Sequence, residues 1–111
     1  MDPNALIREV ESFADIDPEM QIATMLTFLY VARRGTCFQK DIELELGLSN
    51  AAASRNVAYW SDFKIRDVPG YGFISREEDP MDRRYKRLTL TDKGKAFYQR
   101  ILERDYGKAR G

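Results

Sequence analysis

Histidine is absent from this sequence of 111 residues, and cysteine occurs once. The first absence removes the commonest general base and the commonest metal ligand. Because Cys37 is the only thiol, an internal disulfide and the usual sets of zinc ligands are excluded. A glycine-rich phosphate loop and an exposed-serine elbow are also missing, and nothing spaces the acidic residues as a catalytic pair. We therefore expect no metal site, no cofactor and no enzymatic activity.

Long apolar runs are missing as well. The longest falls far short of a membrane span, and no basic segment followed by an apolar one marks a signal peptide. We expect a cytoplasmic protein without a membrane partner, which also fits the lone cysteine. A content of 43% hydrophobic and 32% charged residues is typical of a soluble protein. The length allows a single domain, whose globular part we place at about residues 3–106.

The net charge is zero, but the charges are unevenly distributed along the chain. Residues 1–50 contain 4 basic and 9 acidic side chains, whereas residues 81–111 contain 10 basic and 4 acidic ones. A local basic surface can attract phosphate groups even when the whole molecule is neutral. A solvated basic helix without any partner would account for the same numbers.

Two helix start signals occur in the first third of the chain. Asp2-Pro3 predicts a helix that runs to about Phe13, and Asp17-Pro18 predicts a second helix that ends at Gly35. The first helix carries four apolar residues on one face, namely Leu6, Ile7, Val10 and Phe13. The second carries five apolar residues at helical spacing, which we expect to face the core, namely Ile22, Met25, Leu26, Leu29 and Ala32.

A pair of short helices follows, over Gln39–Leu46 and Asn50–Trp60. The first also shows an alternation of apolar and acidic residues that would fit a strand. We prefer a helix because Gly47 closes the segment and Ser49 caps the next helix after a three-residue turn. Two short helices joined by a tight turn that contains glycine predict a helix-turn-helix.

The helix over residues 50–60 has two different faces. Ala53, Val57 and Trp60 lie on one face, which we expect to be buried. The other face is slim at its N-terminal end, where three consecutive alanines occur, and such an end can enter a major groove about 12 Å wide. The alternative is that the alanines only raise helix propensity. The exposed face comprises Asn50, Ala51, Ser54, Arg55 and Tyr59.

The last third of the chain predicts a hairpin and a helix. Gly72–Arg76 and Arg84–Leu90 are expected to be strands, and Glu77–Asp82 the turn between them. Thr91 caps a final helix over Asp92–Tyr106. The fold class is therefore α+β, mainly α: a winged helix-turn-helix with a two-stranded hairpin wing at residues 72–90 and terminal helices.

The wing is strongly basic. Arginines on such a hairpin can reach phosphates or enter a narrow minor groove, and either Asp79 or Asp82 can orient one of them through a bidentate pair. The alternative is a salt-bridged surface hairpin without a ligand, which would contribute little stability. The basic residues of the hairpin are Arg76, Arg83, Arg84, Lys86 and Arg87.

The runs Asp79–Arg84 and Leu88–Gly94 resemble the wing signature of the MarR family of bacterial regulators. Gln39–Ile42, Leu46–Ser49 and Ser54-Arg55 resemble the helix-turn-helix of that family in the same register. The similarity covers residues 18–105. It implies a homodimer on a palindromic operator in double-stranded DNA, with residues 50–60 in the major groove and the wing in the minor groove.

The resemblance also implies roles for single residues, carried over by position. Those expected to face bases are Ala51, Ala52, Ser54 and Arg55. Gln39 and Tyr59 would touch the DNA backbone, and Arg83 or Arg84 would read the minor groove with Asp82 or Asp79 as orienting partner. The remaining DNA contacts that we predict are Asn50, Arg76 and Lys86.

The sequence departs from the family pattern in several ways. Ser61–Tyr71 adds residues before the wing, and could lengthen the helix, shift the wing or form a surface for a protein partner. Glu43 replaces a small residue where the two short helices cross. The terminal helices, which would carry dimerisation, are short, and so compact a version would suit a phage-infected or bacterial cell. We expect Cys37 to be a buried thiol rather than an oxidant sensor.

The leading hypothesis is a sequence-specific DNA-binding transcriptional regulator. The alternatives are a winged-helix module that binds a host or phage protein, and a DNA mimic or architectural protein. The leading hypothesis depends on one arrangement. The slim end at Asn50–Arg55 and the guanidinium groups of Arg83 and Arg84 must project from the same side of the fold.

Overall fold

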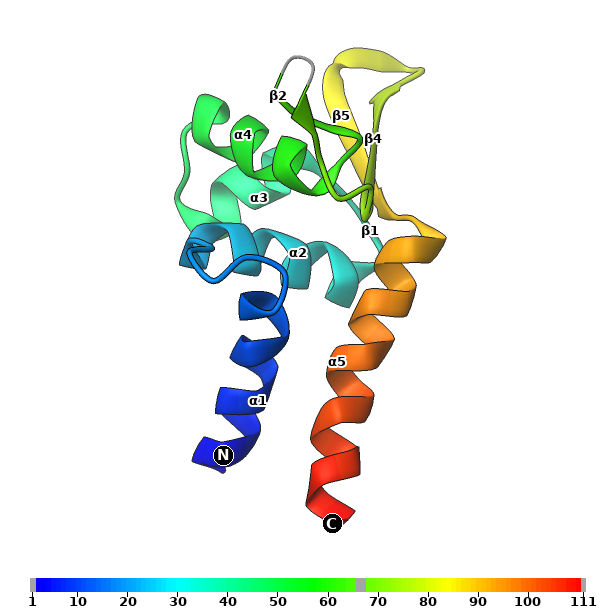
Figure 1. Cartoon of the computed structure of the whole chain (residues 1–111). Helices are drawn as coiled ribbons and strands as arrows, with labels where there is room; N and C mark the ends of the chain where they lie inside the picture. The colour runs from blue at the N-terminus through cyan, green and yellow to red at the C-terminus, as the bar shows by residue number, and fades with distance from the viewer. Residues whose placement is uncertain (1, 66–67, 111) are drawn as a thin grey trace.

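Two helices at the ends of the chain, α1 (Pro3–Ala14) and α5 (Asp92–Arg110), extend side by side away from a central body (Figure 1). The computed structural model describes residues 2–65 and 68–110. α2 (Ile22–Arg34) crosses the body, and the remaining helices and the sheet lie beyond it. Both chain termini therefore lie at the end of the molecule opposite the wing (Figure 1).

The two helix start signals have different outcomes. Asp2 caps α1 as predicted, because its carboxylate accepts a hydrogen bond from the backbone N–H two residues on, at 3.0 Å. Asp17 makes the same contact at 3.0 Å, but it closes a separate turn, and α2 begins only at Ile22. The prediction that a helix begins at Pro18 is therefore wrong.

The buried face of α2 is also different from the predicted one. Ile22 is 71% exposed and Leu26 is 37% exposed, whereas Met25, Leu29 and Ala32 are partly buried. The buried face contains two threonines, which can be buried because their hydroxyl groups are satisfied. Thr27 Oγ1 donates to Ala23 O at 2.7 Å, and Thr24 Oγ1 donates to Asn56 Oδ1 at 2.6 Å. The buried residues of α2 are Thr24, Thr27, Phe28 and Val31.

The helix-turn-helix has the predicted boundaries, α3 (Gln39–Leu46) and α4 (Asn50–Trp60). Gly47 ends α3 with a left-handed φ of 63°, a conformation that glycine adopts without strain. Ser49 caps α4, because its Oγ accepts a hydrogen bond from Ala52 N at 3.1 Å. Local capping chemistry thus fixes both ends of the turn.

The wing consists of β4 (Ile74–Asp79) and β5 (Asp82–Leu90) in antiparallel register. β4 is longer than predicted, so the expected turn at Glu77–Asp82 shrinks to the residues between the two strands. Opposite charges face each other across this extension, since Glu78 pairs with Lys86 and their side chains are 3.0 Å apart. A third strand, β1 (Thr36–Phe38), pairs with the other edge of β5.

The added segment after α4 folds back onto the end of that helix. β2 (Phe63–Ile65) and β3 (Val68–Pro69) form a small antiparallel pair. Backbone N–H groups of Tyr71 and Phe73 then donate to α4 carbonyls at 3.2 and 2.7 Å, which satisfies groups that a helix end leaves unpaired. The described residues of this segment do not lengthen α4, which ends at Trp60, and Asn50 and Ala51 at the other end of α4 are exposed. The role that we predicted for it as a protein-binding surface stays a prediction.

The core is a cluster of aromatic rings that come from α1, α2, α4, α5 and the residue just before β4. Its central rings are Phe13, Phe28, Trp60, Phe73 and Phe97. Ala53 and Val57 of α4 are fully buried beside Trp60, which confirms the predicted buried face of that helix. Within the described part of the chain, no helix combines the length and the apolar composition needed to cross a membrane.

Candidate nucleic-acid interface

A groove of about 670 Å³ opens between the N-terminal half of α4 and the wing. Seven of the predicted DNA-contacting residues line it, so the slim helix end and the wing arginines do project from the same side. Sequence reasoning missed the groove positions of Lys40, Glu43 and Tyr85. We call this feature the interface groove. Its lining residues are Gln39, Lys40, Glu43, Asn50, Ser54, Arg76, Arg83, Arg84, Tyr85 and Lys86.

The interface groove is strongly basic although the chain is neutral. Five of its ten lining residues are lysine or arginine, and one, Glu43, is acidic. The carboxylate of Glu43 accepts a hydrogen bond from Asn50 Nδ2 at 3.2 Å, so the acidic residue that departs from the family pattern touches the first residue of α4. A hollow lined by many like charges concentrates the field there.

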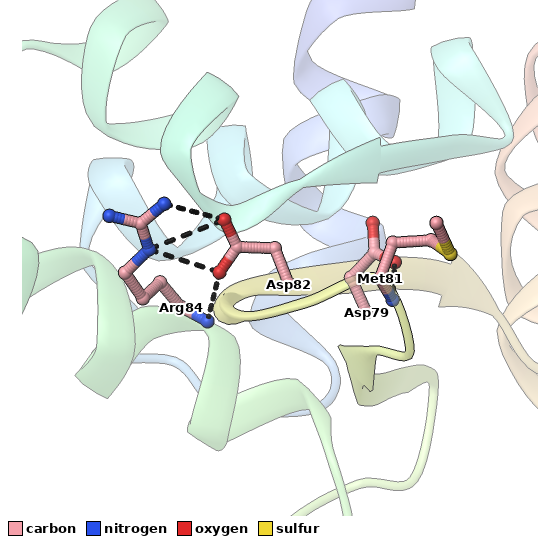
Figure 2. Close-up of polar contacts among 4 residues, drawn as sticks. All are labelled: Asp79, Met81, Asp82 and Arg84. Carbon is pink, nitrogen blue, oxygen red and sulfur yellow. Dashed lines mark hydrogen bonds and ion pairs between the residues drawn. The ribbon is translucent and has the colours of Figure 1, made fainter.

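The wing tip contains an aspartate that holds an arginine (Figure 2). Asp82 Oδ1 accepts hydrogen bonds from Arg84 Nε at 3.0 Å and from Arg84 N at 3.1 Å, and Oδ2 accepts from Nη2 at 2.7 Å. These hydrogen bonds from Arg84 lower the pKa of Asp82 below its ordinary value. Asp79 instead accepts from Met81 N at 2.8 Å and shapes the turn. Of the two predicted orienting residues, Asp82 is therefore the one that contacts an arginine.

Arg83, next to this pair, has an exposed side chain. Among the described residues, no hydrogen bond or ion pair engages its guanidinium group. Lys86 is held differently, since its Nζ donates to Glu78 Oε1 at 3.0 Å. The wing tip therefore presents one oriented arginine and one that is available to a ligand, and Arg87 farther along β5 is exposed as well.

One of the predicted DNA-contacting residues, Arg76, binds two of the others, Gln39 and Ser54. Arg76 Nη1 donates to Gln39 Oε1 at 3.2 Å, to Ser54 Oγ at 3.2 Å and to Ser54 O at 3.3 Å. Arg76 is half-buried, and burial lowers its pKa. Gln39 is buried. The wing strand is thus tied to both helices of the helix-turn-helix.

The rest of the predicted set lies around the helix rather than in the groove. Ala51 is exposed at the N-terminal end of α4. Ala52 and Arg55 line a second hollow of about 390 Å³ on the side of α4 that faces the start of α2. The exposed end of α4 therefore stands between two hollows, which leaves it free to contact a ligand from the tip and from both flanks.

Tyr59 does not have the exposure that its predicted contact with the DNA backbone requires. Its side chain is 7% exposed, and its hydroxyl donates to Asp17 Oδ2 at 2.7 Å. Burial, together with this hydrogen bond, raises the pKa of Tyr59. We therefore assign Tyr59 to the support of α4 and leave it out of the interface. Trp60 also supports α4, since its Nε1 donates a hydrogen bond to Thr24 O at 2.7 Å.

Cys37 is buried in β1, as predicted. Burial raises the pKa of its thiol to about 11, and the nearby Asp41 adds to the effect. A redox-sensing cysteine needs a lowered pKa and exposure, and Cys37 has neither.

No protein-family model matches the sequence, and no curated protein is significantly similar to it. Solved structures do match. The transcriptional regulator Tm0710 from Thermotoga maritima is 20% identical with a TM-score of 0.71, and the match covers 95% of this chain and 69% of that one. A MarR-like transcriptional regulator from the same organism, TM0816, is 26% identical with a TM-score of 0.63, over 94% and 75%.

A mutant MarR from Escherichia coli, solved in complex with operator DNA, is 15% identical with a TM-score of 0.66. That match covers 90% of this chain and 64% of the other. The chain thus spans between 64% and 75% of the length of these three proteins. These structures share the order of helices and wing, which bears out the fold that the sequence predicted.

Proposed function

We propose that this chain, whose fold is that of the MarR-like winged-helix regulators, is a transcriptional regulator that binds duplex DNA sequence-specifically. The observation that carries the proposal is the interface groove, where the slim end of α4 and the wing arginines border one basic hollow. A protein-interaction module would not need cations gathered at this position. DNA-bound structures among the similar proteins add support.

In the proposed complex, the N-terminal end of α4 enters the major groove. Ala51, Ala52 and Ser54 make this end narrow, and Arg55 provides a guanidinium group that suits bidentate contact with guanine. The alanines contact thymine methyl groups, and the hydrogen-bonding residues read base edges. Sequence preference would arise here, because contacts with phosphates carry no base information.

The wing follows the adjacent minor groove and backbone. Asp82 holds Arg84 in one orientation, so less side-chain freedom is lost when the arginine enters a narrow minor groove. Arg83 and Lys86 contact phosphates. This assignment divides the wing into one residue that senses groove width and two that add affinity for any sequence.

We further propose a homodimer formed by the terminal helices. Leu6, Ile7 and Val10 of α1 and Leu102 of α5 are exposed apolar residues on the two helices that extend away from the body. A second copy would bury them and present two interface grooves related by a two-fold axis. Such a dimer would bind a palindromic site with a half-site spacing set by the dimer.

A salt titration tests the proposal. The affinity for a duplex enriched from a random pool is measured by fluorescence anisotropy at increasing salt. About four phosphate contacts would give a slope of about −3.6 in the plot of log affinity against log salt. A flat plot, or failure to enrich any duplex, would rule out the proposed function.

Two double variants show whether the groove is responsible. Arg83→Ala with Arg84→Ala should weaken binding and lower the salt slope by about two. Lys95→Ala with Arg100→Ala removes the same charge from α5, which points away from the groove, and should leave the slope nearly unchanged. Equal effects of the two pairs would mean that the wing has no special role.

A further inference from the structure

Arg76 occupies an unusual position for a residue that sequence reasoning assigned to DNA. Its guanidinium group is half-buried and is held between α3 and α4 instead of projecting from the wing. One nitrogen, Nη1, donates hydrogen bonds to Gln39 Oε1, Ser54 Oγ and Ser54 O at 3.2 to 3.3 Å. A substitution of Arg76 would therefore remove hydrogen bonds from Ser54, which lines the interface groove.

The hydroxyl of Ser54 differs from other hydroxyls on the helices. Ser12 and Thr27 donate their hydroxyl hydrogens to the carbonyl one turn earlier, at 3.1 and 2.7 Å, which is the common arrangement inside helices. Within residues 2–65 and 68–110, Ser54 Oγ accepts from Arg76 and donates to no group. Its hydrogen is therefore available to a ligand in the groove.

We propose that Arg76 is a positioning residue that sets the hydrogen-bonding polarity of Ser54. The guanidinium group occupies one of the two lone pairs of Oγ, and its positive charge disfavours a second donor at the other, so Ser54 acts toward DNA mainly as a donor. This inference rests on the proposed function and assigns a preference to one base position of the site. Arg76 itself touches no base in this account.

The chemistry of base edges turns this polarity into a sequence preference. In the major groove, guanine offers N7 and O6 as acceptors, adenine offers N7 and thymine offers O4, whereas cytosine offers a donor. A hydroxyl that accepts a hydrogen bond from a cation is polarised and becomes a stronger donor. The base that faces Ser54 should therefore be a purine or thymine, and cytosine should be disfavoured.

Site selection from a random duplex pool, carried out with four proteins, tests this assignment. We expect the wild type to enrich a motif in which one position loses its preference in Ser54→Ala, and the same position to lose it in Arg76→Met. The rest of the motif should remain. Lys86→Met is the matched control, because it removes a groove cation that does not touch Ser54, and it should weaken all sequences alike and leave every preference in place.

A second measurement changes the DNA, and its first readout uses the wild-type protein. The acceptor at the Ser54-dependent position is removed from the DNA, with a 7-deazapurine or a thymine analogue that lacks O4. Loss of one hydrogen bond should weaken wild-type binding about five- to tenfold, and the same change should have almost no effect on Ser54→Ala. The Arg76→Met variant is measured with the same DNA pair. A merely structural role of Arg76 would leave the dependence on this DNA atom as large as in the wild type, whereas loss of the dependence supports the positioning role.

The outcomes separate the two proposals. If the wild type enriches no duplex, the proposed function fails and this assignment fails with it. If the wild type enriches a motif but Arg76→Met keeps the preference at the Ser54-dependent position, only the role of Arg76 is overturned. A preference for cytosine at that position, or an unchanged affinity for DNA without the acceptor, would also overturn it while the proposed function stands.

Discussion

Single residues set the electrostatics of the interface groove, and Glu43 is the clearest case. Its carboxylate is the one acidic group among the described side chains that line the groove, and it would lie near phosphates in the proposed complex. Glu43→Gln can retain the hydrogen bond from Asn50 while removing the charge. We expect the affinity for any duplex to rise severalfold at low salt, and the gain to shrink as salt screens the charge.

The control for that variant lies two residues away. Glu45 is exposed on α3 and is not part of the groove, so Glu45→Gln should change the affinity much less. Anisotropy titrations of both variants make the comparison. Equal gains would mean that overall charge, and not the position of Glu43, controls affinity.

Cys37 gives a prediction on pH and reactivity. Its pKa is raised from 9.0 to about 11 by burial, so the folded state keeps the thiol proton where the unfolded chain would lose it. The stability that this difference contributes is fully present below pH 9 and is lost as the pH rises toward 11. A thiol reagent at pH 8 should react with Cys37 only in denaturant, and rapid reaction of the native protein would contradict its burial.

At this scale, some assignments could be made from the sequence and others could not. The Asp82–Arg84 pair was among the alternatives that the sequence allowed, because its members are two residues apart. The hydroxyl of Tyr59 is bound to Asp17, 42 residues away, and a helical wheel cannot reveal such a partner. The same limit concealed that Arg76 binds both Gln39 and Ser54.

Elements were predictable where their ends depend on local chemistry. α3 and α4 have the predicted boundaries because Gly47 and Ser49 cap them within a few residues. The buried face of α2 was mispredicted because Phe28 and two satisfied threonines pack in the core, and this choice depends on tertiary partners. The strands of the β2–β3 pair are three and two residues long, too short for a periodic pattern to identify them, so their structure could not be anticipated.

The attachment of the β2–β3 pair to α4 should depend on Gly70. A Cβ at this position would lie 2.1 Å from Ser61 O, so Gly70→Ala should lower the free energy of unfolding by about 3 kcal/mol, the upper part of the range for overpacking. Gly35→Ala is the control, since nothing lies within 4 Å there and only its positive φ is strained. That change should cost about 1 kcal/mol. Urea denaturation measures both, and a smaller effect at Gly70 would contradict the close approach.

For the whole molecule, the exposed apolar residues of the terminal helices predict a dimer. Ile7 is 54% exposed on α1, and Ile7→Glu should convert the dimer to a monomer by placing a charge in the interface. Sedimentation equilibrium measures the change, and binding to a two-half-site duplex should weaken with it. Ala96→Glu, at an exposed position in the first turns of α5, should leave the dimer intact. A wild-type monomer at micromolar concentration would contradict the prediction.

The winged-helix fold could be predicted because its helix caps, turn glycines and wing residues agreed with one another. For the interface groove, the sequence allowed us only to state a condition: the N-terminal end of α4 and the wing arginines had to project from the same side of the fold. Its depth, its lining and the acidic Glu43 in it depend on how the wing packs against both helices, which no local pattern contains.

The most direct test of the account is an NMR titration of the protein with an enriched duplex. If α4 and the wing grip one double helix together, amide signals of residues 50–55 and 83–86 should shift at the same DNA concentrations. Signals of Gly70 and of the free end of α1 should stay in place apart from effects of dimerisation. Shifts confined to α1, α5 or the β2–β3 pair, with none at the groove, would contradict the central claim.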